Sequence, residues 1–314
     1  MQIFVTGATG VIGRRVVPLL VAGGHQVTAV GRMPEKRAML ERAGAQAIEV
    51  DLFDRQALRA ALAGQQVIIN LATHIPPTSQ FFMPGAWHEN DRLRREASAN
   101  LAEAAKAGGA HRFIQESFAL TYPDHGDDWI AEDTPVPASS YNRSVLAAEA
   151  AAQRFNTDRS IGIALRFASF YSPDSPQTQD MIRYVRAGWA PLPGPARGYM
   201  PSVSSDDAAA AVLAALGLGP GLYNVVDDEP LRRREYFDTL AAALVVKPPR
   251  LLPGWTKALM GSLGETLARS LRISNRKLRG ESAWKPKYPS VRDGWPEIVQ
   301  AQNAPAEAMG RGAS

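Results

Sequence analysis

Tyr141 is the residue whose setting most suggests acid chemistry. It lies in the stretch SSYNRSVLAAEAA, Ser139–Ala151, which has the small residues and the possible Ser N-cap of a helix start. A free phenol holds its proton until pH ~10, so a tyrosine that works as a base near neutrality wants a cation one helical turn away. That position, i+4, is Val145. The sequence therefore offers an acid without its expected cation.

No neighbour in the same stretch replaces that cation. Ser144 shares the predicted helix face of Tyr141 but is neutral, and Arg143 at i+2 points to another face. Such a tyrosine can still donate a proton or a hydrogen bond to a developing oxyanion, but it is a poor base for alcohol oxidation. The sequence favours chemistry in the reducing direction, or chemistry that is not redox at all.

A second group of residues could bind phosphate. The stretch GATGVIG follows the apolar run IFVTG and opens a helical pattern, which places Gly7, Gly10 and Gly13 between a strand and a helix. One glycine permits the sharp turn, one lets backbone N–H groups approach a pyrophosphate, and one lets helix and strand pack closely. Thr9, Val11 and Ile12 complete the predicted dinucleotide contacts.

The residues that follow the second predicted strand indicate which dinucleotide binds. Arg32 stands where an acidic residue would favour the ribose hydroxyls of NAD, and Lys36 and Arg37 follow it. Because Arg32 can contact a 2′-phosphate and stack on adenine, we expect NADP, with NAD still possible. Further cofactor contacts are expected after the third and fourth strands, at Asp51, Leu52, Asn70, Leu71 and Ala72.

Composition limits the classes of protein and site. The 314 residues are 45% apolar and 21% charged, as in globular proteins, and no cysteine is present, which excludes disulfides and thiol chemistry. No metal site is expected. No leader and no uncharged apolar run of ~18 residues is visible, so we expect a cytoplasmic protein without a membrane segment. The basic stretch 231–292 is either a solvated surface or fits an acidic substrate, and we expect no nucleic acid partner.

Apolar runs alternate with helical patterns as far as Phe167, which predicts a parallel sheet covered on both faces. A long helix is predicted from about Asn90 to Ala107. After Phe167 the chain becomes proline-rich, and the tail from Ala301 is expected to be frayed. The segment from His74 to Ala97 begins as a long loop with Phe81, Phe82 and Trp87, which suggests a lid over a site.

The order of motifs resembles the extended short-chain dehydrogenase/reductase superfamily, of the NAD(P)-dependent epimerase/dehydratase type. TGATGVIG resembles its TGxxGxxG, NLAT its NxA, SSYNRSVLAAE its YxxSKxxxE, and GLYNVVDDEP its GxxYNVGxxxP. Further similarities are in VDLFD, FIQESFALTYPD, LRFASFYSPDS, SVSSDDAAAAV and RISNRKLRGESAWKPKYPS. The resemblance covers nearly the whole chain, to about Glu297.

This resemblance implies a Rossmann-type doubly wound parallel sheet and a smaller C-terminal α/β substrate domain. The first domain would span residues 1–167, with a return of the chain at about 203–228, and the second would occupy most of 168–314. The resemblance also implies a Ser/Thr and a Tyr that bond the reacting oxygen, and a Lys four residues after the Tyr. In this sequence Ser117 takes the Ser/Thr position and Tyr141 the Tyr position, whereas Val145 stands in place of the Lys.

Two further residues are expected near the implied cleft. His74 ends the segment NLATH, where a strand would meet its ligand, and is a candidate catalytic residue, although a lone histidine often has a structural role. Glu116 precedes Ser117, so strand alternation puts the two side chains on opposite faces. We therefore expect Ser117 to face the substrate and Glu116 to make a contact within the fold.

These observations predict an NADP(H)-dependent oxidoreductase that reduces a small organic or secondary-metabolite carbonyl, with Tyr141 as proton donor. One alternative is a non-redox isomerase, lyase or cyclase on the same fold, and another is an NADP-binding regulatory protein. Nucleotide-sugar epimerisation is less favoured, because its oxidation step needs the missing base. Relatives often dimerise through the helices that include the Tyr141 segment, so a homodimer is possible.

Overall fold

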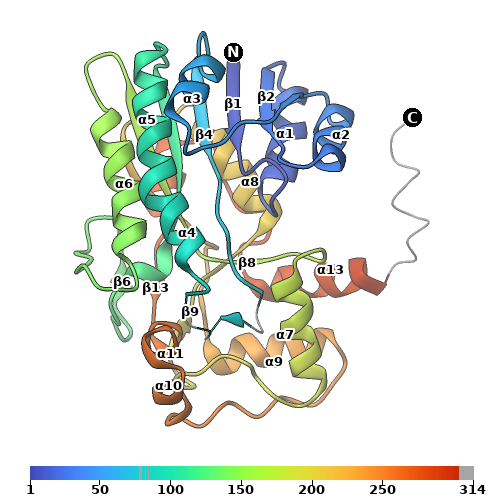
Figure 1. Cartoon of the computed structure of the whole chain (residues 1–314). Coiled ribbons are helices and arrows are strands. Elements are labelled where there is room, and N and C mark those ends of the chain that lie inside the picture. The colour runs from blue at the N-terminus through green and yellow to red at the C-terminus, as the bar shows by residue number, and fades with distance from the viewer. Residues whose placement is uncertain (78–79, 82, 84, 304–314) are drawn as a thin grey trace.

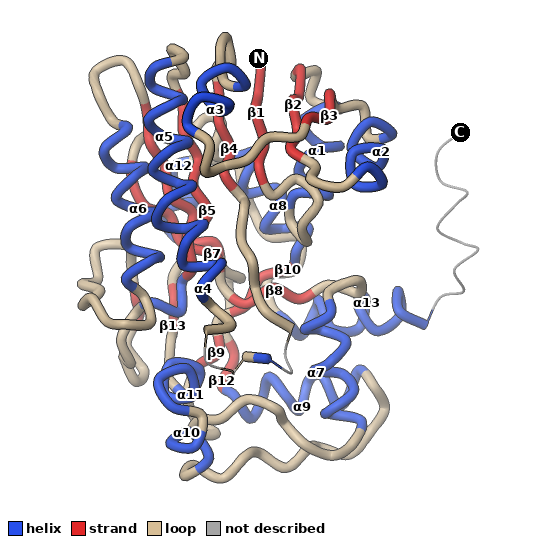
Figure 2. Tube along the Cα trace, viewed as in Figure 1, coloured by secondary structure: helices blue, strands red, loops and turns tan. Residues whose placement is uncertain are grey.

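The computed structural model describes residues 1–77, 80, 81, 83 and 85–303. Within them the central feature is a sheet of parallel strands, ordered β11-β7-β5-β4-β1-β2-β3 (Figures 1 and 2). These strands are β1 (Gln2–Thr6), β2 (Gln26–Val30), β3 (Gln46–Ile48), β4 (Val67–Asn70), β5 (Arg112–Phe118), β7 (Ile161–Phe167) and β11 (Gly221–Val225).

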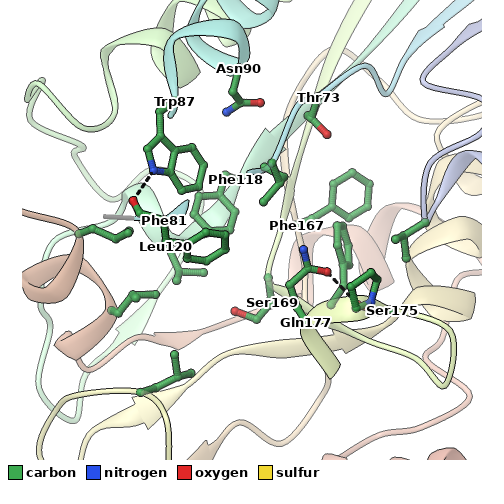
Figure 3. Close-up of a pocket in the computed structure, with 18 of the residues that line it drawn as sticks. Thr73, Phe81, Trp87, Asn90, Phe118, Leu120, Phe167, Ser169, Ser175 and Gln177 are labelled. Atoms are coloured by element: carbon green, nitrogen blue, oxygen red, sulfur yellow. Dashed lines mark hydrogen bonds between the residues drawn. The ribbon is translucent and has the colours of Figure 1, made fainter. Parts of the chain in front are cut away.

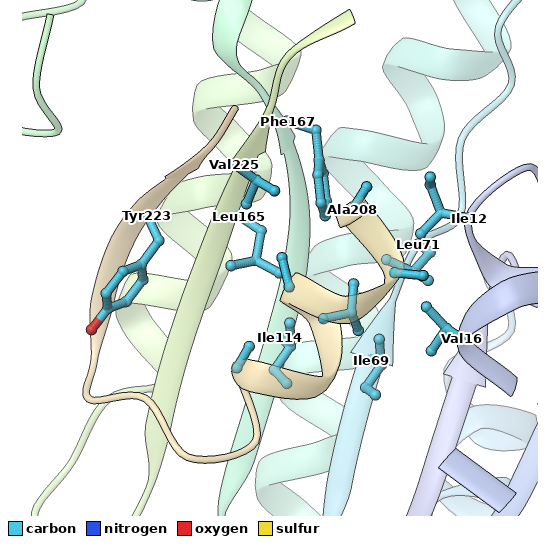
Figure 4. Close-up of a cluster of buried hydrophobic side chains, with 14 of the residues drawn as sticks. Ile12, Val16, Ile69, Leu71, Ile114, Leu165, Phe167, Ala208, Tyr223 and Val225 are labelled. Carbon is cyan, nitrogen blue, oxygen red and sulfur yellow. The ribbon is translucent and has the colours of Figure 1, made fainter. Parts of the chain in front are cut away.

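Helices cover both faces of this sheet. One face carries α1 (Gly13–Ala22), α8 (Ser205–Ala214) and α12 (Arg276–Glu281), and the other carries α3 (Arg55–Ala61), α5 (Ser98–Ala107) and α6 (Arg143–Phe155). The side chains of each strand alternate between the two cores: Ile3 and Val5 pack toward α1 and α8, whereas Phe4 packs toward α3 and α5. Figure 4 shows the core under α8. The predicted doubly wound Rossmann-type fold is confirmed.

The smaller C-terminal part packs below the carboxyl ends of the strands (Figure 1). Its core contains Tyr171, Val185, Phe237 and Trp295. The elements of this part are β8 (Ser169–Tyr171), α7 (Pro176–Arg186), β9 (Tyr199–Met200), β10 (Ser202–Ser204), β12 (Leu231–Arg232), α9 (Arg233–Ala243), α10 (Thr256–Leu259), α11 (Gly261–Ala268) and α13 (Val291–Asn303). Helix α13 includes residues 301–303, and the rest of the tail that was expected to be frayed lies outside the described residues.

A few shorter elements remain. They are α2 (Pro34–Arg42), α4 (His88–Arg92), β6 (Trp129–Ile130), β13 (Arg272–Ile273) and a 3-10 turn at Ala119–Thr121. The predicted long helix from about Asn90 to Ala107 is interrupted by a π-helical segment, Leu93–Ala97, which separates α4 from α5. No helix among the described residues is long and apolar enough to cross a membrane.

Candidate active site

A cavity of about 910 Å³ lies at the carboxyl ends of the central strands. It is next to the boundary between β1 and β4, where the order of the strands in the sheet reverses. Clefts of open α/β sheets form at this position because the connections on either side turn in opposite directions. The cavity extends from the glycine-rich loop after β1 to α11 and the segment 73–87. A cavity of this shape can hold a nucleotide at the glycine-rich loop and a second molecule toward α11.

The glycine-rich loop fits a dinucleotide phosphate. Gly7 has φ +64°, and a Cβ added there would lie 2.2 Å from the carbonyl oxygen of Leu71. A Cβ at Gly13, where α1 begins, would lie 2.2 Å from the oxygen of Gly7, and the Gly10 N–H donates to that same oxygen at 3.0 Å. Side chains at Gly7 and Gly13 would collide with the backbone that shapes the loop, and the helix N-terminus leaves N–H groups for an anion.

The predicted cofactor residues lie along this loop and beyond it. Six of them line the cavity, namely Gly7, Gly10, Val11, Ile12, Gly13 and Leu71, while Thr9 and Ala72 are their direct neighbours in the chain. Asn70 is fully buried, with its amide donating to Ser98 and Gln115 and its oxygen accepting from Thr6 and from the Ala72 N–H. Asn70 therefore holds the backbone around Leu71 rather than presenting its own side chain.

The region expected to hold the adenosine lies past β2 and β3. Arg32 is exposed just after β2, whereas Arg37 is held by Glu49 at 2.6 Å and by the carbonyl oxygens of Gly31 and Arg32. Asp51 follows β3 by three residues and accepts the Phe53 N–H at 2.9 Å, with half-buried Leu52 between them. Arg32 is thus the better placed of these two arginines to meet a phosphate.

Tyr141 lines the cavity from a turn just before α6, whose first residue is Arg143. The direction of the Tyr141 side chain therefore cannot be taken from helical periodicity. Val145 is buried in the core and does not line the cavity. Burial raises the pKa of Tyr141 to about 12, although the charges of Arg94 and Arg269 act to lower it. The phenol keeps its proton at neutral pH and can act as a donor.

The structure does not bring Ser117 to the cavity. Its side chain is fully buried on the other face of β5 and donates to Glu149 at 2.5 Å. Glu149 is in turn held by two hydrogen bonds from Arg166, at 2.6 and 2.7 Å. Contrary to the sequence-based expectation, Glu116 and Phe118 are the β5 residues that face the cavity.

His74 also lies away from the cavity. Its side chain is exposed, and its backbone N–H donates to Asn90 Oδ1 at 2.9 Å. The neighbours Thr73 and Ile75 line the cavity instead. His74, between these two residues, has the outward position.

Aromatic side chains form much of the wall of the cavity that Tyr141 lines. Phe81, Trp87, Phe118 and Phe167 surround the opening in Figure 3, with Ser169 and Gln177 below them. Trp87 Nε1 donates to the Phe81 carbonyl oxygen at 3.0 Å, and the two rings are 5.4 Å apart. The predicted lining by Phe81 and Trp87 is observed, and Phe82 lies outside the described residues.

An ion pair that was not expected from the sequence also lines the cavity. Arg94 Nη2 donates to Glu116 Oε1 at 2.9 Å, and the two side chains are 6% and 12% exposed. The sequence DRLRREA carries three arginines, and the π-helical segment decides which of them turns inward. Regular α-helical periodicity in the sequence does not indicate which of the three arginines is buried.

The chain is similar to known proteins over most of its length. Residues 3–225 match the model of the NAD dependent epimerase/dehydratase family. The chain is 31% identical over 305 residues to a Streptomyces protein named 3-diazoavenalumate denitrifying reductase, covering 94% of this chain and 99% of the relative. It is 29% identical over 312 residues to a 2-alkyl-3-oxoalkanoate reductase of Stenotrophomonas maltophilia, covering 90% and 86%.

A solved structure supports the fold. A human epimerase family protein crystallised with NADPH has a TM-score of 0.81 at 22% identity, covering 96% of this chain and 99% of that one. The reductase names of the sequence relatives confirm the expected oxidoreductase in the reducing direction, and a nicotinamide dinucleotide is its cofactor. By sequence and by fold, this chain belongs to the NAD dependent epimerase/dehydratase family.

Proposed function

We propose that this oxidoreductase uses NADPH to reduce a small, largely apolar organic molecule of the secondary-metabolite type, with a carbonyl as the reacting group. The observation that carries the proposal is the continuous cavity between the glycine cradle and Tyr141. When bound at the cradle, the dinucleotide supplies the hydride. The chain itself supplies the binding surface, the exclusion of water and the proton.

The walls of the cavity support a compact apolar acceptor. The four aromatic rings named above line the same cavity as Tyr141, and Met181, Leu192 and Leu263 extend the apolar lining toward the C-terminal part. Small-molecule sites of this kind are mostly apolar, with a few polar groups that fix orientation. A nucleotide sugar would place many hydroxyl groups against these surfaces, which is why the proposal does not favour one.

Tyr141 is the proposed proton donor. The reduction of a carbonyl leaves negative charge on oxygen, and a protonated phenol at that oxygen neutralises it. Because burial raises the pKa of Tyr141 to about 12, the donor form persists throughout the usual assay range. The same pKa makes Tyr141 a weak base, which supports the reducing direction.

NADP is the proposed dinucleotide, on account of Arg32. Changing Arg32 to Ala is expected to weaken NADPH binding by about 10–100-fold, the loss of one charged hydrogen-bonding partner, and to change NADH binding by much less. Dissociation constants from tryptophan fluorescence would measure both. Lys36→Ala is the matched control, and equal losses of NADPH and NADH in Arg32→Ala would point to adenine stacking instead.

A diazo compound is the second candidate acceptor, suggested by the printed name of the Streptomyces relative. In such a reduction of a diazonium form, the carbon–nitrogen bond breaks, dinitrogen leaves with the bonding electron pair, and a hydride takes its place. No proton donor is needed for that step. A cavity without a lysine four residues after Tyr141, and without Ser117, suits this chemistry as well.

The purified protein with NADPH and a panel of aromatic ketones, β-keto acids and aryl diazo compounds tests the proposal. We expect NADPH consumption with a reduced organic product in at least one class, and nitrogen release only in the diazo class. Tight NADPH binding without oxidation by any acceptor would contradict it, and product formation at constant NADPH would indicate an isomerase or lyase. The proposed setting is the cytoplasm, and light scattering would test a homodimer.

A further inference from the structure

The ion pair Arg94–Glu116 lies buried in the cavity wall. One hydrogen bond joins the two side chains, and Arg94 Nε and Glu116 Oε2 are buried without a hydrogen-bond partner in the described part of the chain. A buried pair with unmet hydrogen-bonding capacity contributes little to stability, because desolvation offsets its attraction. Both residues line the same cavity as Tyr141, where a charge can act on the reacting groups.

Local backbone geometry puts Arg94 in this position. In the π-helical segment the Ser98 N–H donates to the Leu93 carbonyl oxygen, five residues earlier, so the hydrogen-bonded loop contains one more residue than in an α-helix. Arg94 is buried there, whereas Arg92 and Arg95 are exposed. Glu116, projecting from β5, then holds the Arg94 guanidinium beside the cavity.

We propose that Arg94, held by Glu116, is a positioning residue for Tyr141 and supplies the positive charge that Val145 cannot. The inference rests on the proposed function, in which Tyr141 donates a proton. A phenol that gives up its proton becomes negatively charged, and a guanidinium nearby stabilises that charge. Arginine stays protonated in proteins, so Arg94 contributes charge and does not itself transfer the proton.

The charged groups around Tyr141 support this assignment. Burial raises the pKa of Tyr141, and the charges of Arg94 and Arg269 act against that increase, in that order. Arg269 is tied to the carbonyl oxygens of Leu120 and Tyr122, at 3.4 and 2.9 Å. Of the two acidic groups on the same wall, Glu116 faces Arg94, and Asp91 accepts the hydroxyl of Ser144 at 2.6 Å.

A double-mutant cycle tests the assignment with a carbonyl acceptor. Arg94→Gln is expected to lower kcat by about 10²-fold, the effect of removing one preorganised charge partner, and Arg94→Lys to recover most of it. If Arg94 acts through Tyr141, adding Arg94→Gln to Tyr141→Phe causes no further loss. Losses that multiply would overturn the proposal, because they would show that Arg94 acts on its own.

A second measurement does not depend on turnover. Glu116→Gln removes the carboxylate that offsets Arg94, so the pKa of Tyr141 should fall, whereas Arg94→Gln should raise it. Tyrosinate absorbance, taken as the difference between each variant and the same variant with Tyr141→Phe, reports both. Shifts in the same direction, or none, would contradict the coupling even if no acceptor is reduced.

Matched controls separate this role from a structural one. Arg95→Gln changes an exposed arginine of the same π-helical segment and should alter neither kcat nor the pKa of Tyr141. Thermal unfolding of every variant checks folding. A kcat loss in Arg94→Gln that follows its loss of stability, and that Arg94→Lys does not recover, would assign the pair to the fold. An inactive wild-type protein would reject the proposed function but not the coupling.

Discussion

Replacing Tyr141 with Phe is expected to lower kcat for a carbonyl acceptor by about 10²–10⁴-fold, the usual contribution of a positioned proton donor. The ring remains, so the shape of the cavity and KM should change little. Because the pKa of Tyr141 is about 12, the wild-type rate should show no loss of this donor between pH 6 and 10. Steady-state kinetics across this range measure both effects.

The same variant separates the two candidate acceptors. Hydride replacement of dinitrogen needs no proton donor, so Tyr141→Phe should leave diazo reduction within a few-fold of wild type. Ser117→Ala serves as the control, since its hydroxyl bonds Glu149 on the far face of β5. We expect it to lose about 1–3 kcal/mol of stability with little change in kcat. A large kcat loss in the folded Ser117→Ala protein would restore the sequence-based assignment.

Replacing Gly7 with Ala is expected to abolish dinucleotide binding and to lower the free energy of unfolding by about 3–5 kcal/mol. The added Cβ would lie 2.2 Å from the oxygen and 2.3 Å from the carbon of the Leu71 carbonyl group, both backbone atoms that cannot turn aside. The left-handed φ of +64° adds about 1–2 kcal/mol for any residue with a Cβ. Chemical denaturation and NADPH titration measure the two losses.

Gly24 provides the matched control. It has φ +75°, but an added Cβ would meet no atom within 4 Å. Gly24→Ala therefore has the same backbone strain without the clash and should lose only about 1–2 kcal/mol, with NADPH binding intact. Equal stability losses in the two variants would mean that the loop after β1 moves to accommodate the methyl group, contrary to a rigid cradle.

The sequence by itself determined the fold and the cofactor loop, because local patterns encode both. Alternating apolar runs and helical segments give a parallel sheet with two covered faces, and each strand contributes alternately to each core. The spacing of Gly7, Gly10 and Gly13 specifies a close approach of backbones that only glycine permits. The resemblance of SSYNRSVLAAE to YxxSKxxxE also assigned Tyr141 to the site, and the structure has Tyr141 in the cavity wall.

Only the tertiary structure decided which other side chains meet Tyr141. Strand alternation predicted that Glu116 and Ser117 face opposite ways, but not which way, because both faces of a central strand are buried. The π-helical segment shifted the helix phase at Arg94, which periodicity cannot reveal. The turn before α6 removed Val145 from the site altogether. Contacts between β5 and the helix after α4, more than twenty residues apart, thus set the charge in the cleft.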